Sequence, residues 1–257
     1  MTAPTRPLAL VTGASSGIGL EIARELAARD HDLLLVAEDE RVHLTAASLD
    51  AQAVRADLAT AEGVEELWTA VLATGRPLEV AVLNAGVGRG GAFADNPLED
   101  ELQVVALNVT GTTRLAKRVV QAMVGQGSGR ILFTSSIAST MPGPYQAVYN
   151  ASKSYVQSLA EALVEELEDS GVTVTSLMPG PTDTEFFARA DLLDTALGQG
   201  PKDDPATVAK QGVEALLKGE RKVVGGGLLT RAQAATNAVL PDALKAKGHA
   251  AGAKPRD

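Results

Sequence analysis

Short apolar runs alternate with longer segments of helical periodicity along most of the chain. Buried strands are short and apolar, whereas amphipathic helices repeat with a period of 3.6 residues. This alternation predicts an α/β fold, a doubly wound parallel sheet with helices on both faces. The predicted strands are residues 8–12, 33–37, 53–56, 80–84, 130–135, 172–178 and 222–224, and the predicted helices are 17–29, 40–48, 60–73, 98–125, 145–170 and 205–218.

The length of 257 residues allows one large α/β domain or two small ones. No Pro/Gly/Ser-rich linker divides the chain before about residue 198, and no repeat of fixed period is present. The runs 33–37 and 131–135 are continuously apolar, which predicts central strands. We therefore expect a single domain over residues 1–244, followed by a disordered tail at 245–257, where small and charged residues prevail.

Charge and composition exclude several kinds of partner. The formal net charge is −9, whereas nucleic acid and anionic lipid require clustered Lys and Arg. Cysteine is absent, and the three histidines, His31, His43 and His249, lie far apart and are expected on the surface. We predict no metal site, no nucleic-acid or membrane partner, and a small-molecule substrate.

The beginning of the chain lacks the basic and apolar regions of a signal peptide. No apolar run reaches the length of about 18 residues that a membrane span needs. We therefore expect a cytoplasmic protein.

The first predicted strand runs directly into the glycine-rich turn TGASSGIG and then into a helix. Glycines at these positions let the backbone turn sharply and approach a pyrophosphate, and the helix N-terminus offers unpaired N–H groups and a positive dipole end. A glycine cluster alone can also mark only a tight turn. The predicted dinucleotide contacts are Gly13, Ser15, Ser16, Gly17, Ile18 and Gly19.

Tyr149 and Lys153 are four residues apart in a segment of helical period, so their side chains project from one helix face. An adjacent ammonium can lower the pKa of a tyrosine from its ordinary value of about 10 and make it a usable acid or base. Ser136 follows the fifth predicted strand, at the edge where open α/β sheets bind ligands. Its hydroxyl could polarise a substrate oxygen.

These features occur in a fixed order and together resemble the short-chain dehydrogenase/reductase family, over residues 8 to about 225. The glycine spacing G-x-x-x-G-x-G, the Asn-Ala-Gly triplet at 84–86 and the Tyr-x-x-x-Lys pair carry the resemblance. It implies a Rossmann-type sheet of about seven strands in the order 3-2-1-4-5-6-7. It also implies an NAD(P)-dependent oxidoreductase acting on secondary alcohols or ketones, and a homodimer or homotetramer formed through the helices at 98–125 and 145–170.

The resemblance assigns four catalytic side chains. Tyr149 would exchange the hydroxyl proton of the substrate, and Ser136 would hold the substrate oxygen. Lys153 would lower the pKa of Tyr149 and bind the nicotinamide ribose, while Asn108 would position a water behind Lys153. Ser135 points to the opposite side of its strand from Ser136 and is expected to be structural.

Further cofactor contacts follow from the same resemblance. An aspartate after the third strand would bind the adenine ring, the Asn-Ala-Gly triplet would shape the cleft, and a threonine after the sixth strand would contact the nicotinamide part. These positions are Asp57, Leu58, Asn84, Ala85, Gly86, Pro179, Gly180 and Thr184, with Thr182 as the alternative to Thr184.

The second predicted strand ends in Ala37-Glu38-Asp39, where the adenosine ribose would lie. A carboxylate can accept hydrogen bonds from the ribose hydroxyls of NAD but repels the 2′-phosphate of NADP. Many members of the family carry Ala-Arg-Arg here, and some that prefer NADP have a basic residue in place of Ser16. We expect NAD, with Glu38 as the contact and Asp39 as the alternative; NADP remains possible because Arg41 could turn toward a phosphate.

The irregular segment at about 183–200 is expected to fold over the substrate as a lid. Its apolar side chains, facing a second loop, predict a moderately hydrophobic alcohol or ketone, although packing of a short helix would explain any one of them. The predicted lid residues are Phe186, Phe187, Leu192 and Leu193, with Met141, Gly143 and Pro144 opposite.

Two other functions remain open at this stage. The same scaffold also supports isomerases and dehydratases. A non-catalytic cofactor-binding or regulatory protein could share the fold, although the complete set of Asn108, Ser136, Tyr149 and Lys153 argues against lost catalysis.

Overall fold

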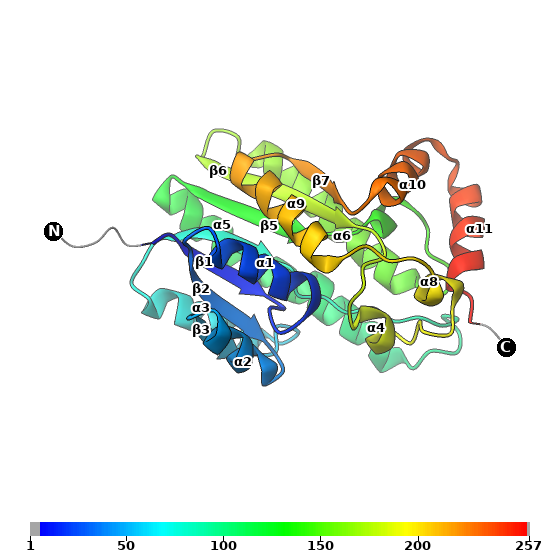
Figure 1. Ribbon diagram of the computed structural model, residues 1–257, viewed down its shortest axis with the longest axis horizontal. Coiled ribbons are helices and arrows are strands. Elements are labelled where there is room, and N and C mark those ends of the chain that lie inside the picture. Colours follow the sequence, from blue (N-terminus) through cyan, green and yellow to red (C-terminus); the bar gives the residue numbers. More distant parts are fainter. Residues whose placement is uncertain (1–5, 256–257) are drawn as a thin grey trace.

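Seven parallel strands form one sheet in the computed structural model, which describes residues 6–255 (Figure 1). The strand order is β3-β2-β1-β4-β5-β6-β7, so the predicted α/β fold and strand order are confirmed. All seven predicted strands are present within a few residues of their expected ends. The strands are β1 Leu8–Thr12, β2 Asp32–Ala37, β3 Gln52–Arg55, β4 Leu78–Leu83, β5 Gly129–Thr134, β6 Val172–Pro179 and β7 Lys222–Gly225.

Each face of the sheet has its own apolar core. The side chains of β1 divide between the two, because successive residues of a strand point to opposite faces. Leu8 and Leu10 pack toward α3 (Ala61–Ala73), α5 (Thr112–Gln126) and α6 (Ala147–Glu166). Ala9 and Val11 pack on the other face, where α1 (Gly17–Ala27), α2 (Arg41–Ser48) and α9 (Pro205–Lys218) lie.

Local sequence signals explain where α9 begins and ends. Asp204 caps its N-terminus by accepting hydrogen bonds from the Ala206 and Thr207 amides, and Pro205 occupies the first turn, where no N–H is needed. Gly219 ends the helix in the left-handed conformation, with φ of 70°. Between these ends, buried apolar residues of α9 pack against the sheet beside α1.

The predicted helix at 98–125 is interrupted. Helix α4 (Leu98–Val105) passes into a π-helical segment, Ala106–Gly111, before α5 begins. A π-helical turn holds one more residue than an α-helical turn and occurs often at functional sites. The segment contains Asn108, one of the predicted catalytic residues, which is buried.

The last part of the described chain is helical, which differs from the disordered tail predicted for 245–257. Helices α10 (Leu228–Val239) and α11 (Asp242–Ala253) lie together at one end of the molecule, and residues 256–257 are outside the described range (Figure 1). Ala253 is fully buried, and Thr195 forms a bridge with Pro255. Tertiary contacts therefore order a segment whose composition alone indicated disorder.

Three shorter helical pieces follow the carboxyl ends of β5 and β6. A 3-10 turn spans Ile137–Thr140, and α7 (Phe186–Arg189) and α8 (Ala196–Gln199) lie within the predicted lid. Within residues 6–255, no helix has the length and apolar character needed to cross a membrane.

Candidate active site

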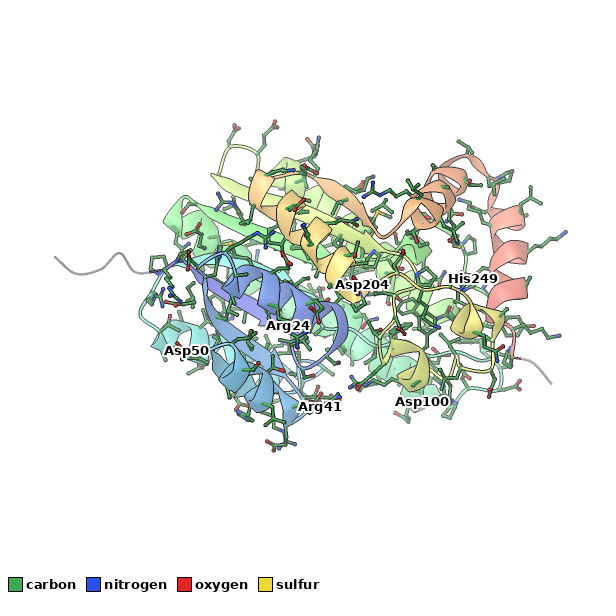
Figure 2. The ribbon with its side chains drawn as sticks, viewed as in Figure 1. Arg24, Arg41, Asp50, Asp100, Asp204 and His249 are labelled. Atoms are coloured by element: carbon green, nitrogen blue, oxygen red, sulfur yellow. The ribbon has the colours of Figure 1, made fainter. Side chains whose placement is uncertain are left out.

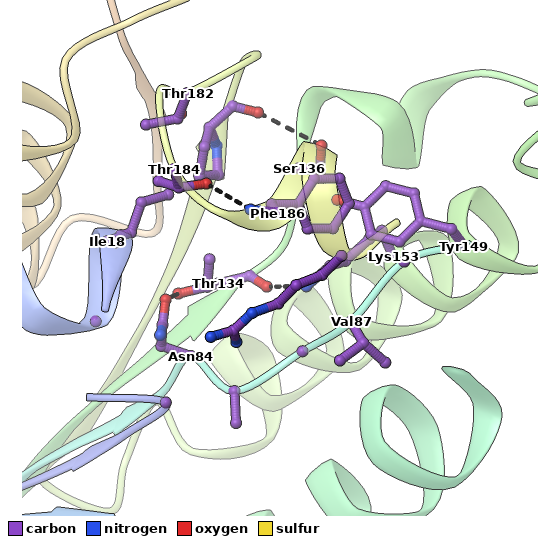
Figure 3. Close-up of a pocket in the computed structure, with 18 of the residues that line it drawn as sticks. Ile18, Asn84, Val87, Thr134, Ser136, Tyr149, Lys153, Thr182, Thr184 and Phe186 are labelled. Carbon is purple, nitrogen blue, oxygen red and sulfur yellow. Dashed lines mark hydrogen bonds between the residues drawn. The ribbon is translucent and has the colours of Figure 1, made fainter. Parts of the chain in front are cut away.

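The carboxyl ends of β1 and β4 meet where the strand order reverses, the position at which open α/β sheets bind ligands. The Thr12 hydroxyl accepts hydrogen bonds from the Asn84 and Ala85 amides, both at 2.9 Å. Asn84 Nδ2 donates to the Thr12 carbonyl, and Asn84 Oδ1 accepts from Thr134 Oγ1 at 3.1 Å (Figure 3). Asn84 therefore joins β1, β4 and β5 at this edge.

The glycine-rich turn is packed too closely for side chains. A Cβ at Gly19 would lie 2.2 Å from the Gly13 carbonyl oxygen and 2.5 Å from Asn84 Nδ2. Gly13 and Gly17 also adopt positive φ values, 66° and 57°. A Cβ at Gly17 would lie 3.0 Å from Thr184 Cγ2, so Thr184 closes over the turn from the opposite side.

One pocket runs from the glycine-rich turn past the ends of the strands to the C-terminal helices. It brings together every residue that the sequence predicted as a cofactor contact. These are Gly13, Ser15, Ser16, Gly17, Ile18, Gly19, Glu38, Asp57, Leu58, Asn84, Ala85, Gly86, Tyr149, Lys153, Pro179, Gly180, Thr182 and Thr184.

Asp39, rather than Glu38, is bound to the glycine-rich turn. Ser15 Oγ donates to Asp39 Oδ2 at 2.8 Å, and Arg41 donates to Asp39 Oδ1 from both its backbone N and Nε at 3.1 Å. Burial raises the pKa of the Asp39 carboxyl, but the hydrogen bonds from Arg41 and Ser15 together lower it by more. The pKa of Asp39 therefore lies below its ordinary value. Glu38 is exposed, and Arg55 Nε binds only its backbone oxygen.

Tyr149, Lys153 and Ser136 converge midway along the pocket (Figure 3). Tyr149 and Lys153 lie on one face of α6, with Lys153 Nζ 6.0 Å from the centroid of the Tyr149 ring. Lys153 Nζ donates to the Thr134 carbonyl at 2.9 Å. Ser136 follows β5 and accepts a hydrogen bond from the Ala138 amide through its hydroxyl, at 3.1 Å. Both predicted catalytic side chains of α6 are buried.

The protonation of these groups differs from the sequence-based expectation. Burial raises the pKa of Tyr149 to about 12, and a hydrogen bond with Ser136 opposes this only in part. The predicted lowering by Lys153 is absent because the ammonium is directed at the Thr134 carbonyl instead of the phenol oxygen. Burial lowers the pKa of Lys153 to about 8. Tyr149 is therefore protonated at neutral pH.

Asn108 lies behind the pocket wall and does not line it. Its Oδ1 accepts from the Val87 amide at 2.9 Å, and its Nδ2 donates to the Val87 carbonyl at 2.8 Å and to Ser152 Oγ at 2.9 Å. A Cβ at Gly86 would lie 3.2 Å from both Asn108 Oδ1 and Lys153 Nζ. Asn108 thus holds the loop that follows the Asn-Ala-Gly triplet beside Lys153.

Ser135 has the structural surroundings expected of it, although it also lines the pocket. Its Oγ donates to the Lys153 carbonyl at 3.2 Å, and its amide donates to the Leu177 carbonyl at 2.8 Å. These bonds tie the end of β5 to α6 and β6.

Aromatic side chains from the lid cover Tyr149. The ring centroids of Tyr149 and Phe186 are 5.1 Å apart, and those of Phe186 and Phe187 are 5.6 Å apart. A Cβ at Gly88 would lie 2.5 Å from Phe186 Cζ, so the lack of a side chain there makes room for the ring. Met141 lines the pocket as predicted.

Four of the predicted substrate contacts do not line the pocket: Gly143, Pro144, Leu192 and Leu193. Gly143 packs against Asn150, whose Cγ would be 2.1 Å from an added Cβ. Leu192 is buried in a small cluster with Phe187, whereas Leu193 is 54% exposed. The turn between α7 and α8 directs Leu192 and Leu193 away from the pocket, which their apolar character alone could not reveal.

Sequence reasoning also missed several lining residues and misplaced two histidines. His31 is buried instead of exposed, and His249 lines the pocket. Residues 6–255 hold no group of three or more His, Asp or Glu side chains that could bind a metal ion. The missed lining residues include Gln146, Leu197, Gln233 and His249, and no local sequence pattern marks them.

Ion pairs hold the lid on two sides. Arg41 donates to both carboxylate oxygens of Glu185, at 2.7 Å and 3.0 Å. Arg89 Nη1 lies 2.7 Å from Asp191 Oδ2. The Gly90 amide also donates to the Ala190 carbonyl at 2.7 Å. The lid is therefore attached to the start of α2 and to the loop after β4.

Comparison with known proteins agrees with the fold. The family model described as short chain dehydrogenase matches residues 7–192. A 3-oxoacyl-[acyl-carrier-protein] reductase from Synechocystis sp. is 37% identical over 187 residues, which cover 70% of this chain and 76% of that protein. The chain therefore belongs to the short-chain dehydrogenase family, a family of oxidoreductases.

Solved structures show the same fold. A short-chain dehydrogenase/reductase from Burkholderia phymatum in complex with NAD is 26% identical, with a TM-score of 0.82 over 93% of this chain and 94% of that chain. A short-chain dehydrogenase from Sphingobium yanoikuyae in complex with NADPH is 30% identical, with a TM-score of 0.77 over 90% and 93%. Neighbours of this fold therefore bind either nicotinamide cofactor.

Proposed function

We propose that this protein transfers a hydride between a nicotinamide cofactor and a secondary alcohol or ketone, with Tyr149 as the general acid or base. The observation that carries the proposal is the convergence of Tyr149, Lys153 and Ser136 between the glycine-rich turn and the aromatic lid. The similarity to a 3-oxoacyl-[acyl-carrier-protein] reductase supports chemistry at a carbonyl group.

The pocket fits a dinucleotide at its glycine-rich end. The absence of side chains at Gly13, Gly17 and Gly19 leaves backbone N–H groups open beside the N-terminus of α1, where an anionic pyrophosphate is stabilised. Thr184 and Lys153 both line the pocket and would hold the nicotinamide half. A bound nicotinamide cofactor supplies or accepts the hydride.

The protein's own residues supply orientation and a proton. Because Tyr149 keeps its proton at neutral pH, it can donate that proton to a carbonyl oxygen as the ketone is reduced. The Ser136 hydroxyl can hold the same oxygen. Lys153 carries a positive charge below its pKa of about 8. Turned from the Thr134 carbonyl toward the phenol oxygen, this charge would stabilise the negative charge that develops on Tyr149 during the reaction. The reverse sequence oxidises an alcohol.

We further propose that NAD is the preferred cofactor and that Asp39 is the ribose contact. Asp39 is ionised and already joined to the glycine-rich turn through Ser15. A carboxylate there can accept hydrogen bonds from ribose hydroxyls and repels a 2′-phosphate. Arg41 is directed at Asp39 and Glu185, which leaves its charge balanced by two carboxylates.

Exposed apolar side chains support the homodimer or homotetramer that the family resemblance implies. Leu98 and Leu102 on α4 are 64% and 48% exposed, and Tyr155 on α6 is 39% exposed. Apolar surface of this kind on two adjacent helices is typical of protein–protein contacts.

The direct test follows NADH and NADPH absorbance with a panel of secondary alcohols and ketones at equal cofactor concentrations. We expect turnover of ketones, with the higher kcat/KM for NADH. Cofactor binding without turnover of any member of the panel would favour a non-catalytic binding protein. A higher kcat/KM for NADPH would contradict the role of Asp39.

A further inference from the structure

Two side chains from the C-terminal helices reach the pocket. His249 of α11 and Gln233 of α10 line the end that contains Met141 and Leu197. Both helices lie beyond residues 7–192, the part matched by the family model. Figure 2 shows His249 on the side of α11 that faces the rest of the chain.

Hydrogen bonds fix these helices beside the catalytic serine. Lys245 Nζ donates to the Thr140 carbonyl at 3.0 Å, and Asn237 Nδ2 donates to Thr140 Oγ1 at 3.4 Å. Thr140 ends the 3-10 turn that Ser136 caps. The helices therefore form one wall of the pocket that Ser136 and Tyr149 also line.

Helix α11 also packs against the lid. Gly252 and Ala253, three and four residues after His249, belong to the same side of the helix. Ala253 is fully buried, and a Cβ at Gly252 would lie 4.0 Å from Leu197 Cβ. Helix α11, which carries His249, thus contacts both the lid and the 3-10 turn that Ser136 caps.

The imidazole of His249 lacks a partner for one nitrogen. Its Nε2 is buried and makes no hydrogen bond within residues 6–255. A buried polar atom without a partner costs free energy, and a ligand that supplies the partner recovers it. Burial lowers the pKa of His249, so the ring is neutral at neutral pH and suits an uncharged partner.

The charges around this end of the pocket disfavour an anionic substrate. The Arg189 guanidinium is paired with Glu185, which also binds Arg41. Among the described lining residues, Lys153 is therefore the cation without an ion pair, and it serves the catalytic tyrosine. A substrate carboxylate near His249 would be buried without a counter-ion, which is costly.

We propose that His249 contacts the substrate and hydrogen-bonds a second, uncharged oxygen of it. The substrate class is then a ketone or secondary alcohol with an apolar body and a hydroxyl or carbonyl group at the end away from the reacting carbon. This inference rests on the proposed function, because it takes the reacting carbon to lie at Tyr149.

The test measures binding separately from turnover. Three series of ligands of matched chain length are titrated calorimetrically into the NADH-loaded Tyr149→Phe protein: 2-alkanones, their ω-hydroxy derivatives and the corresponding keto acids. The same titrations are made with the Tyr149→Phe/His249→Phe protein, with a His249→Gln version, and with His43→Phe as a matched control, since the His43 side chain is 53% exposed on α2.

We expect the ω-hydroxy ketones to bind most tightly to the Tyr149→Phe protein. His249→Phe should weaken them about tenfold and leave the plain ketones within about twofold, the change expected for one lost hydrogen bond. His249→Gln should restore most of the loss, because its amide nitrogen lies near the position of Nε2, and His43→Phe should change neither series.

Equal losses for plain and hydroxylated ketones would assign His249 a packing role and overturn the proposal, as would tightest binding of the keto acids. These results do not depend on turnover. With the unmodified protein, failure to oxidise NADH with any of the ketones would overturn the proposed function alone, while the binding differences would still decide the role of His249.

Discussion

The two ends of the pocket are built in different ways. The cofactor end consists of backbone and small side chains at the carboxyl ends of strands. A Cβ added at Gly13 or Gly19 would lie 3.0 Å or 2.5 Å from Asn84 Nδ2, so no side chain fits there. The substrate end consists of larger side chains from the lid and the C-terminal helices, such as Phe186 and His249.

The difference shows how the two ends respond to change. The cofactor end depends on the geometry of a few turns fixed to the central sheet, so even one methyl group disturbs it. The substrate end depends on side chains carried by short helices and loops, which can vary while the sheet stays the same. The border between them is Tyr149, buried between the glycine-rich side and the lid.

Gly19→Ala should have the largest effect, because its Cβ would lie 2.2 Å from the Gly13 carbonyl oxygen. Overpacking typically costs about 1–3 kcal/mol, and the displaced turn should weaken cofactor binding on the order of a hundredfold. The control is Gly125→Ala, at an exposed position in α5 with nothing within 4 Å, which should stabilise the fold by about 0.5–1 kcal/mol. Urea unfolding and NADH fluorescence titration measure both quantities; equal behaviour of the two variants would refute the close packing.

The pH profile of ketone reduction sharpens the border between the two ends. Lys153 is cationic below its pKa of about 8 and neutral above it, whereas Tyr149 keeps its proton up to about 12. The kcat/KM for reduction should be level below pH 8 and fall about tenfold per pH unit above it, as for loss of one essential proton. A level profile up to the ordinary lysine pKa of 10.5 would contradict the lowered pKa of Lys153.

The carboxylates after β2 test how specific the cofactor end is. Asp39→Asn should raise the Kd of NADH about tenfold, because hydrogen bonds to a charged group contribute about 1.5–3 kcal/mol. It should also reduce the preference of the protein for NADH over NADPH. Glu38→Gln should change the Kd by less than about twofold, since Glu38 is exposed and its side chain is not tied to the turn. The reverse order of effects would restore Glu38 as the contact.

The smallest effect is expected at the ion pair between Arg41 and Glu185, which links the two ends across the pocket. Glu185→Gln should raise the cofactor dissociation rate by less than about fivefold, because exposed ion pairs contribute about 0–1 kcal/mol. High salt should remove the difference. The matched control is Glu65→Gln, whose partner Arg118 is similarly exposed on the helices far from the pocket; an equal effect of both substitutions would argue against a link to the lid.

The sheet and the cofactor end could be predicted because their signals are local. Short apolar runs that alternate with helical segments predicted the strands. The turn after β1 contains glycines because Gly13 and Gly17 adopt positive φ values, and glycines at a strand-to-helix turn are visible in the sequence. The helix at 228–239 was missed because its apolar residues are exposed, as Leu228, Leu229 and Val239 show, so no buried stripe marks it. The roles of Leu192 and His249 depend on how segments distant in sequence pack together, which composition does not encode.

Removal of one hydroxyl group tests the central claim most directly. The Tyr149→Phe protein keeps the ring that packs against Phe186, so we expect its NADH Kd to stay within about twofold of the parent. Loss of the proton donor should lower ketone turnover by at least about a hundredfold. Undiminished turnover, with cofactor binding intact, would contradict the assignment of Tyr149, which lies between the cofactor end and the substrate end, as the general acid.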